Sequence, residues 1–298
     1  MKKTIALAVT FLMLCANATF AARWTAKHVV FIGMDGWGAY SLPKADMPNV
    51  KKLMAEGAYT LKKRSVLPSS SAVNWASMFM GAGPEIHGYT QWNTRTPEIP
   101  SRVLNDHGIF PTIFSLLREA EPNAEIGCIH EWSGIAYVVD TLALSYHKQI
   151  TEKPLNVNTT KTAVEYIRSK RPTLTLIAFD EPDHVGHSIG HDTPEYYAKL
   201  KELDGYIGQI VEAVREADMI DNTIFIFTSD HGGINRGHGG KTLREMESPF
   251  IISGKGIRKG VIIEGSMMQF DVAATIARIF RLKQPQVWIG RPMMEVFK

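Results

Sequence analysis

Short apolar runs recur along the chain with amphipathic segments between them, and they limit the possible folds more than any other sequence feature. Runs that are apolar throughout and bounded by polar or glycine-rich residues are typical of strands buried on both faces of a parallel sheet. We predict strands at His28–Met34, Glu125–His130, Thr173–Phe179 and Thr223–Thr228, with a further candidate at Pro249–Ser253.

Helical patterns fill the intervals between these runs. They cover Pro48–Gly57, Ile113–Glu121, Thr159–Lys170, Pro194–Ala217 and Asp271–Phe280. This alternation predicts an α/β fold with a doubly wound, mostly parallel central sheet and helices on both faces. No internal repeat or interdomain linker interrupts the pattern, so we expect one domain over residues 23–298. The segment from Gln91 to Pro111 is rich in Pro, Asn and Asp and is interpreted as a long surface excursion near the site.

Residues 1–22 have the pattern of a secretory signal peptide. Lys2 and Lys3 supply a basic start, and the apolar stretch Ile5–Leu14 is too short to span a bilayer. Small residues suitable for cleavage follow at Ala18, Ala21 and Ala22. We therefore expect an exported protein, periplasmic or secreted, without a membrane span. A lipid anchor at Cys15 is disfavoured because a bulky leucine precedes it.

The charge balance argues against nucleic-acid binding. The chain carries a formal net charge of +3, and two of these charges, Lys2 and Lys3, belong to the predicted signal peptide. So small a net charge gives little long-range attraction to a nucleic acid. Removal of the signal peptide would also leave Cys128 as the only cysteine, so the apolar core, and not a disulfide, must stabilise the fold.

Aspartates and histidines follow three of the predicted strands. A single aspartate in such a place is usually a helix cap or a turn residue, and a lone histidine is usually structural. The carboxyl ends of parallel strands, however, meet at one edge of the sheet, where ligands bind. Six such residues are expected to converge there: Asp35, Asp183, His187, Asp230, His231 and His238.

A mixture of carboxylates and imidazoles predicts a transition-metal site. It suits Zn²⁺, or Mn²⁺, better than Ca²⁺, which prefers oxygen ligands alone. Six protein ligands are enough for two ions. A pair of ions about 4 Å apart can stabilise both the attacking and the leaving oxygen in a displacement at phosphorus. We therefore predict two divalent metal ions as cofactors, most simply zinc.

Several spaced motifs occur together and in a fixed order: Asp35-Gly36, Pro68–Asn74, Gly81–Gly88, Glu181–His187 and Ser229–Gly232. In these motifs the chain resembles the type I phosphodiesterase/nucleotide pyrophosphatase branch of the alkaline phosphatase superfamily. The resemblance implies a bimetallic hydrolase of phosphate esters with a hydroxyl nucleophile that becomes transiently phosphorylated. It also implies that Asp35, Asp230 and His231 hold the metal that activates the nucleophile. The other metal would be held by Asp183, His187 and His238.

The family pattern places the nucleophile three residues before an asparagine. This selects Ser71, ahead of Asn74, over its neighbours Ser69 and Ser70. Metal coordination can favour the alkoxide of a serine without a histidine base, which makes Ser71 a predicted metal ligand as well. Asn74 is predicted to donate its amide to a phosphoryl oxygen, although a helix-capping role is compatible with the same position.

The sequence departs from the family pattern at two positions beside the nucleophile. Trp75 stands where a histidine usually follows the asparagine. Ala72 stands where alkaline phosphatases carry an arginine that grips a monoester dianion, which favours diesters or pyrophosphates. Another basic residue could replace that arginine, and the candidates are Arg64, Arg95 and Arg236. No cysteine lies near Ser71, which counts against a sulfatase.

Aromatic residues near the predicted site could stack on a flat group such as a nucleobase, or simply wall the pocket. They are Trp37, Trp75, His130, Trp132, His184 and His191. His87 is expected to orient a loop and not to bind metal.

The predicted substrate is a small phosphate ester or a nucleotide. The alternatives are a phosphomonoesterase on the same fold and a non-catalytic periplasmic protein that binds a metal or ligand. The sequence leaves the oligomeric state open.

Overall fold

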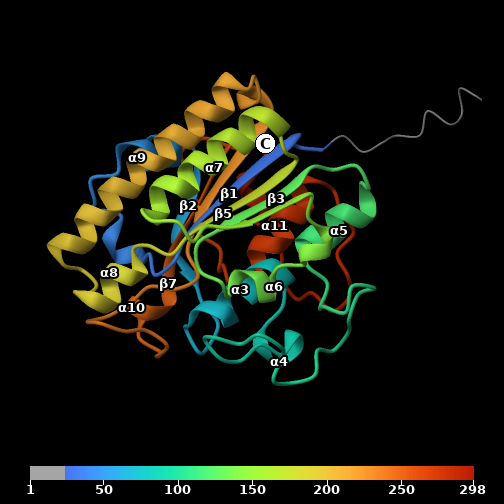
Figure 1. The fold of residues 1–298 in the computed structure, drawn as a ribbon, viewed down its shortest axis with the longest axis horizontal. Coiled ribbons are helices and arrows are strands. Elements are labelled where there is room, and N and C mark those ends of the chain that lie inside the picture. Colours follow the sequence, from blue (N-terminus) through green and yellow to red (C-terminus); the bar gives the residue numbers. More distant parts are fainter. Residues whose placement is uncertain (1–23) are drawn as a thin grey trace, which may run out of the picture.

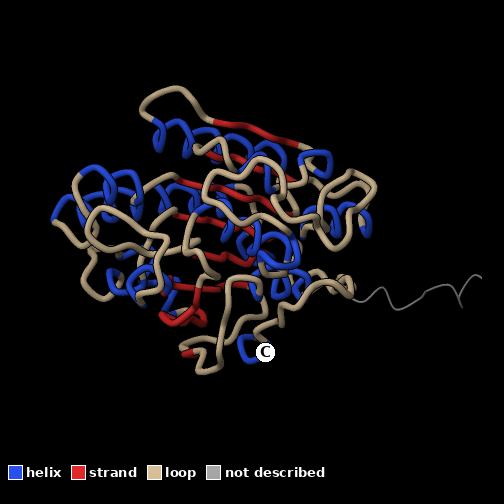
Figure 2. Tube along the Cα trace, turned by 90° about the horizontal axis from the view of Figure 1, so that it is seen from below, coloured by secondary structure: helices blue, strands red, loops and turns tan. Residues whose placement is uncertain are grey.

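One eight-stranded sheet runs through the protein, as a computed structural model describing residues 24–298 shows (Figures 1 and 2). The predicted signal peptide lies outside the described residues. The strands are β1 (His28–Met34), β2 (Gly57–Arg64), β3 (Ile126–His130), β4 (Tyr146–Gln149), β5 (Leu174–Phe179), β6 (Thr223–Thr228), β7 (Glu247–Gly254) and β8 (Val261–Ile262). Their spatial order is β4-β3-β5-β1-β6-β7-β2-β8. All neighbouring pairs are parallel except the two that involve β7.

Helices cover both faces of this sheet, as the sequence predicts (Figure 1). The helices are α2 (Pro48–Ala55), α3 (Ser71–Met80), α4 (Pro84–His87), α5 (Ile113–Ala120), α6 (Ile135–Val138), α7 (Leu155–Lys170), α8 (Asp183–Ser188), α9 (Pro194–Glu216), α10 (Leu243–Met246) and α11 (Asp271–Ile279). Helices α2, α7 and α9 pack on one face, and α3, α5 and α11 pack on the other.

The central strand β1 shows why the predicted runs must be apolar throughout. Successive side chains of a strand point to opposite faces of the sheet. Val29 and Phe31 belong to the core beneath α3, α5 and α11, whereas Val30 and Ile32 belong to the core beneath α7 and α9. Both faces are therefore covered, and the carboxyl ends of the strands are left as the place where polar side chains can gather.

The sequence reading of β7 requires a correction. The apolar run Pro249–Ser253 does form a strand, but β7 is antiparallel to both β6 and β2 and is not one of the parallel strands. Three strands were not predicted. β2 carries two lysines and an arginine, β4 is the sequence Tyr-His-Lys-Gln at the sheet edge, and β8 has only two residues, so none of them has a continuous apolar run.

The junction between α2 and β2 also differs from the prediction. Gly57 does not end the helix, because α2 stops at Ala55 and Gly57 begins β2. A Cβ atom at residue 57 would lie 2.2 Å from the carbonyl oxygen of Ile252 on β7. Glycine is required here because two backbones approach closely.

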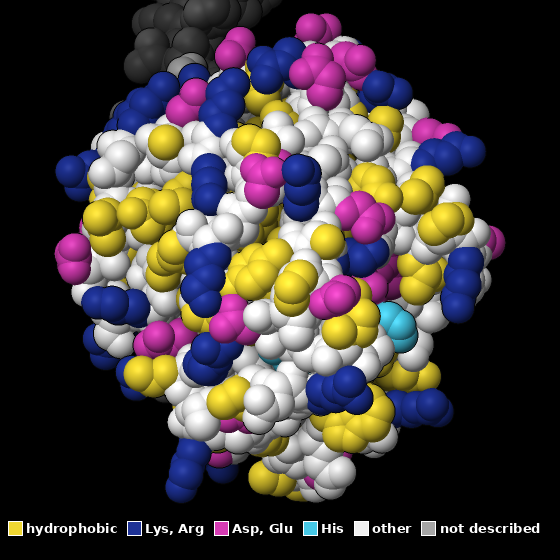
Figure 3. Space-filling model, turned by 90° about the vertical axis from the view of Figure 1, so that its left-hand side faces the viewer, with side chains coloured by type: hydrophobic (Ala, Val, Ile, Leu, Met, Phe, Trp, Pro, Cys, Tyr) yellow, Lys and Arg dark blue, Asp and Glu magenta, His cyan; other side chains and the backbone are white. Residues whose placement is uncertain are grey.

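The distribution of charged side chains and the character of the helices can be described for residues 24–298. On the face that Figure 3 shows, basic and acidic side chains alternate and do not segregate into a basic patch. Among residues 24–298, no helix has the length and apolar character required to cross a bilayer. Cys128 is fully buried in β3, as expected for a packed small residue, and burial raises the pKa of its thiol.

Candidate metal centre and active site

Three adjacent strands bring the predicted ligands to one edge of the sheet. Asp35 directly follows β1, which lies between β5 and β6. Asp183 opens α8 after β5, and Asp230 and His231 follow β6. The register pairs Met34 with Phe179 and Gly33 with Thr228, so the three strands end at nearly the same level. The topology therefore gathers the side chains that the sequence analysis expected to converge.

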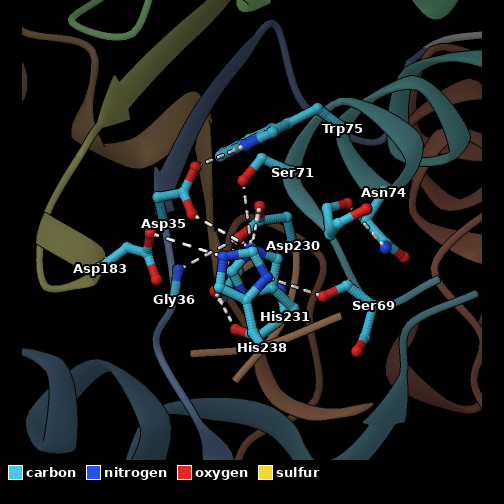
Figure 4. A network of polar contacts seen from close by, with 12 residues as sticks. Asp35, Gly36, Ser69, Ser71, Asn74, Trp75, Asp183, Asp230, His231 and His238 are labelled. Carbon is cyan, nitrogen blue, oxygen red and sulfur yellow. Dashed lines mark hydrogen bonds and ion pairs between the residues drawn. The ribbon is translucent and has the colours of Figure 1, made fainter. Parts of the chain in front are cut away.

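The first group of ligand atoms comes from Asp35, Asp230 and His231. The His231 Nε2 atom lies 3.4 Å from Asp35 Oδ1 and 3.1 Å from Asp230 Oδ2. One ligand atom from each residue lies within 4.8 Å of the others, and all three side chains are buried (Figure 4). This arrangement can enclose one cation.

The second group comes from Asp183, His187 and His238. The His187 Nε2 atom lies 3.1 Å from both Asp183 Oδ2 and His238 Nε2, and His238 Nε2 lies 3.8 Å from Asp183 Oδ2. His231 also lies within reach of this group, and its ring stacks on that of His238 with 3.7 Å between centroids. The two groups are therefore neighbours, as a site for two cations requires.

Backbone carbonyl groups hold the three histidines in a ligand orientation. The Nδ1 atom of His187 lies 3.0 Å from the carbonyl oxygen of Arg236. His231 Nδ1 lies 2.8 Å from that of Gly232, and His238 Nδ1 lies 2.9 Å from that of Ser69. Since only a protonated Nδ1 can donate to a carbonyl, each ring turns Nε2 toward the site. Such a contact is the usual support of a metal-binding histidine.

The unsatisfied oxygens of the site also fit bound cations. Within the described part of the chain, Asp35 Oδ1, Asp183 Oδ1 and Asp230 Oδ2 are buried and have no hydrogen-bond partner. A buried, unpaired carboxylate oxygen costs several kcal/mol, on the order of 1–3 kcal/mol even for a neutral group. A divalent cation in each group would offset this cost, so the residues fit the two predicted metal ions.

The pKa shifts of the same groups indicate an excess of negative charge in the site. Burial raises the pKa of Asp35 well above its usual range, and the Asp230 and Asp183 carboxylates raise it further. Burial, followed by the charge of Asp183, raises the pKa of Asp230 to about 7. The hydrogen bond to Asp183 raises the pKa of His187 to about 9. These shifts indicate that the site binds positive charge, whether a proton or a cation, more strongly than the same groups would in water.

Ser71 is the serine of the 69–71 cluster that faces the ligands. It is the first residue of α3, it is 8% exposed, and its Oγ lies 3.2 Å from His231 Nε2 (Figure 4). Ser69 Oγ instead donates to the carbonyl of Gly240 at 2.6 Å and accepts from the Gly239 N–H. Ser69 therefore secures the loop of His238, and its hydroxyl is not directed at the two ligand groups.

The geometry around Asn74 does not match the phosphoryl-oxygen donor that the sequence predicted. Its side chain is fully buried, and its Nδ2 donates to the carbonyls of Val66, Pro68 and Ser70 at 3.0–3.3 Å. Its Oδ1 accepts the N–H of Val66 at 2.8 Å. With both amide atoms already occupied, Asn74 fastens the loop that carries the serines to α3, and donation to a substrate would require these bonds to break.

Trp75 stands where the family usually has a histidine, and it forms a hydrogen bond with one of the predicted metal ligands. Its Nε1–H donates to Asp35 Oδ2 at 3.1 Å, which fixes one carboxylate oxygen and leaves the other for a cation (Figure 4). The indole lies directly over β1, where a Cβ atom on Gly33 would come within 2.2 Å of Trp75 Cη2. Glycine at this position is therefore what allows Trp75 to lie beside Asp35.

Two residues beneath the site were missed by sequence reasoning. Lys63 of β2 is fully buried and donates to the carbonyl of Ser229 at 2.8 Å and to the Gln269 side chain. Gln269 Nε2 donates to the carbonyls of Ser229 and Asp230. Together they hold the segment that presents Asp230 and His231. A buried lysine carries no local sequence signal, and the strand that bears it was not predicted.

Some of the other aromatic residues expected near the site line the small cavity, and others are buried in the core. Trp132 and His184 line the small cavity beside Ser71, whereas Trp37 and His130 are fully buried. His191 is buried with its Nε2 3.7 Å from Asp183 Oδ1. His87 is buried 3.0 Å from Ser77 Oγ and accepts the N–H of Tyr89, which agrees with its expected role of orienting a loop.

Two adjoining cavities open beside Ser71. The larger, of about 620 Å³, is lined by Pro68, Ser70, Thr90, Gln91, Trp92, His187, His238 and Gly239. The smaller, of about 180 Å³, is lined by Ser71, Trp92, Trp132, Asp180, Asp183, His184, His187 and His238. Within residues 24–298, no lysine or arginine lines either cavity.

Comparison with known proteins establishes the family. Residues 29–250 match the type I phosphodiesterase / nucleotide pyrophosphatase family, and the chain belongs to that family. It is 23% identical to human ectonucleotide pyrophosphatase/phosphodiesterase family member 5 over 76% of this chain and 49% of the relative. It is 24% identical to the mouse bis(5'-adenosyl)-triphosphatase enpp4 over 70% of this chain and 47% of the relative. The chain thus spans about half the length of these curated relatives.

Solved structures agree on the fold. The murine ectonucleotide pyrophosphatase/phosphodiesterase 5, as an inactive variant in complex with AMP, superposes with a TM-score of 0.71 at 16% identity. That match covers 87% of this chain and 96% of the other. A 2-O GAG sulfatase superposes with a TM-score of 0.73 at 16% identity, over 90% of this chain and 73% of the other. The α/β fold is therefore that of the alkaline phosphatase superfamily.

Proposed function

We propose that this protein is an exported, metal-dependent phosphodiesterase that uses Ser71 as its nucleophile. The family and the human relative are named as phosphodiesterases and pyrophosphatases, and the mouse relative is named as a bis(5'-adenosyl)-triphosphatase. Asp35, Asp230 and His231 would hold one divalent cation, together with Ser71. Asp183, His187 and His238 would hold the second. Zinc fits this donor set best, and manganese is the alternative.

The absence of lysine and arginine from the described cavity walls supports a diester over a monoester as the substrate. A monoester dianion has an additional negative charge that needs a cationic partner. The side chains of the three candidates from the sequence make other contacts. Arg64 lies 3.6 Å from Glu247, Arg95 lies over the ring of Tyr137, and Arg236 donates to the carbonyl of Ile189. A diester carries a single negative charge and needs no such residue.

The chemistry assigned to this chain begins at Ser71. Its Oγ attacks the phosphorus and displaces one alcohol, which leaves the phosphorus bonded to Ser71 and to the retained ester group. Water then breaks the bond between Ser71 Oγ and phosphorus, which restores the serine and releases a phosphate monoester. Two bound cations would favour the Ser71 alkoxide and stabilise negative charge on the attacking and leaving oxygens. Ser71 lies at the N-terminus of α3, where the helix dipole favours the negative phosphoryl group.

The proposal includes the compartment. The basic and apolar pattern of residues 1–22 supports export to the periplasm or outside the cell. The substrate class is a small phosphodiester or a nucleotide derivative, in line with the names of the relatives.

Hydrolysis of p-nitrophenyl esters tests the proposal directly. The metal-loaded protein should hydrolyse bis(p-nitrophenyl) phosphate with a kcat/KM at least about tenfold above that for p-nitrophenyl phosphate. EDTA should abolish the activity, and zinc or manganese should restore it. A preference for the monoester would keep the metal site but change the function to that of a phosphatase. No turnover of any ester with metal demonstrably bound would favour a binding protein.

A further inference from the structure

An exposed tryptophan forms part of the wall of the larger cavity beside Ser71. Trp92 is 59% exposed, and its side chain lines both the large cavity and the small cavity that contains Ser71. A tryptophan left this open to water loses the favourable burial of a large apolar surface. A ligand that covers the ring would recover it.

The loop that carries Trp92 is fastened to the active site. The N–H of Ala72, the residue after Ser71, donates to the carbonyl oxygen of Trp92 at 3.1 Å. Thr94 Oγ1 donates to the carbonyl of Gln91 at 2.9 Å, and the N–H of Gln91 donates back to Thr94 Oγ1 at 3.1 Å. The Glu98 carboxylate accepts the N–H of Thr90 at 2.8 Å. These bonds position the backbone that carries Trp92 relative to the nucleophile, so the ring is held beside the site.

Apart from the two histidines of the ligand groups, the other walls of the large cavity that the structure describes carry no charged side chain. They are formed by Pro68, Ser70, Thr90, Gln91 and Gly239, with His187 and His238 at the end shared with the ligand groups. A second phosphate, as in a pyrophosphate, would find no lysine or arginine among these described residues. In the adjoining small cavity it would also approach the Asp180 carboxylate. The walls therefore suit an uncharged group.

We propose that the Trp92 cavity binds an uncharged, flat or apolar ester group of the substrate. Trp92 is then a specificity-determining residue, and the preferred substrate is a phosphodiester with an uncharged organic substituent, not a nucleotide pyrophosphate. This inference rests on the proposed phosphodiesterase function, with the phosphate at Ser71 and the substituent against the indole face.

The test uses the metal-loaded full chain and two diesters with the same leaving group, bis(p-nitrophenyl) phosphate and methyl p-nitrophenyl phosphate. The variants are Trp92→Ala, which removes the ring, and Trp92→Phe, which keeps a flat face. Leu142→Ala is the matched control, because Leu142 is 69% exposed and lines a different cavity. Because Trp92 lies largely outside the core, its truncation should leave the thermal unfolding midpoint unchanged.

Loss of a stacked ring should lower kcat/KM for bis(p-nitrophenyl) phosphate about tenfold in Trp92→Ala, mainly through KM, and Trp92→Phe should recover most of the loss. If methyl p-nitrophenyl phosphate loses as much, the cavity binds the leaving group. If it is unaffected, the cavity binds the retained group. A Trp92→Ala enzyme within twofold of wild type on both diesters would overturn the inference while leaving the phosphodiesterase function intact. A wild-type protein that hydrolyses neither diester would instead refute the function itself.

Discussion

At the scale of single residues, the site separates the side chains that can react from those that hold them. Ser71 presents its Oγ to His231, whereas its neighbours Ser69 and Asn74 use their polar atoms on backbone groups. The three serines look alike in sequence, and only the start of α3 gives them different surroundings. The assignment of Ser71 therefore makes a prediction that distinguishes it from its neighbours.

Ser71→Ala should lower kcat for bis(p-nitrophenyl) phosphate by roughly a thousandfold or more, because the phosphorylated intermediate can no longer form. Zinc content should stay near two ions, since the six aspartate and histidine ligands remain. Ser70→Ala, which also removes a hydroxyl from the loop, should retain substantial kcat. Activity and metal content by elemental analysis check both points. A dead Ser70→Ala enzyme beside an active Ser71→Ala enzyme would move the nucleophile by one residue.

At the scale of secondary-structure elements, the sequence predicted what its apolar periodicity encodes. The strands β1, β3, β5 and β6 and the helices α5, α9 and α11 were predicted to within about two residues. α3 was not predicted, because it is buried along its whole length and lacks a polar face. The segment Gln91–Pro111 was expected near the site, but the role of Trp92 within it and the role of Lys63 in β2 were not predicted, since both depend on contacts between distant segments.

The close packing of β1 against α3 predicts the effect of a substitution at Gly33 on stability. Gly33→Ala should lower the free energy of unfolding by about 1–3 kcal/mol, because the new methyl group would collide with the rigid Trp75 indole. The displaced indole should also weaken zinc binding through its lost bond to Asp35. Gly205→Ala is the matched control. Gly205 lies in α9 with no atom within 4 Å of the added Cβ, so this change should stabilise the helix by roughly 0.5–1 kcal/mol.

Urea denaturation of the wild type and the two variants, with and without zinc, measures these effects. A Gly33→Ala protein as stable as the wild type would show that Trp75 can move without cost, which would contradict the close approach described above.

At the scale of the whole molecule, metal binding, protonation and stability are linked. Asp230, with a pKa of about 7, and His187, with a pKa of about 9, must lose their protons before they can bind a cation. Protons therefore compete with the metal increasingly as the pH falls through this range. The metal stabilises only the folded state in which its ligands converge.

Zinc should consequently raise the thermal unfolding midpoint more at pH 8 than at pH 5.5, with an apparent affinity that falls about tenfold per pH unit for each proton displaced. Differential scanning calorimetry of EDTA-treated protein with and without zinc measures the shift. Asp183→Asn should reduce the shift at both pH values. An equal zinc-induced shift at pH 5.5 and pH 8 would rule out these residues as the linked groups.

The order in which the strands are synthesised determines when the two ligand groups can form. Asp35 is synthesised early, directly after β1, yet the partners that surround it follow β5 and β6, which are made much later. His238 follows β6 and emerges last of all. Since domains are made from the N-terminus onward, a growing chain that has not yet reached β6 can complete neither ligand group. The first ligand group therefore requires a chain that extends at least through His231, and both groups together require one that extends at least through His238.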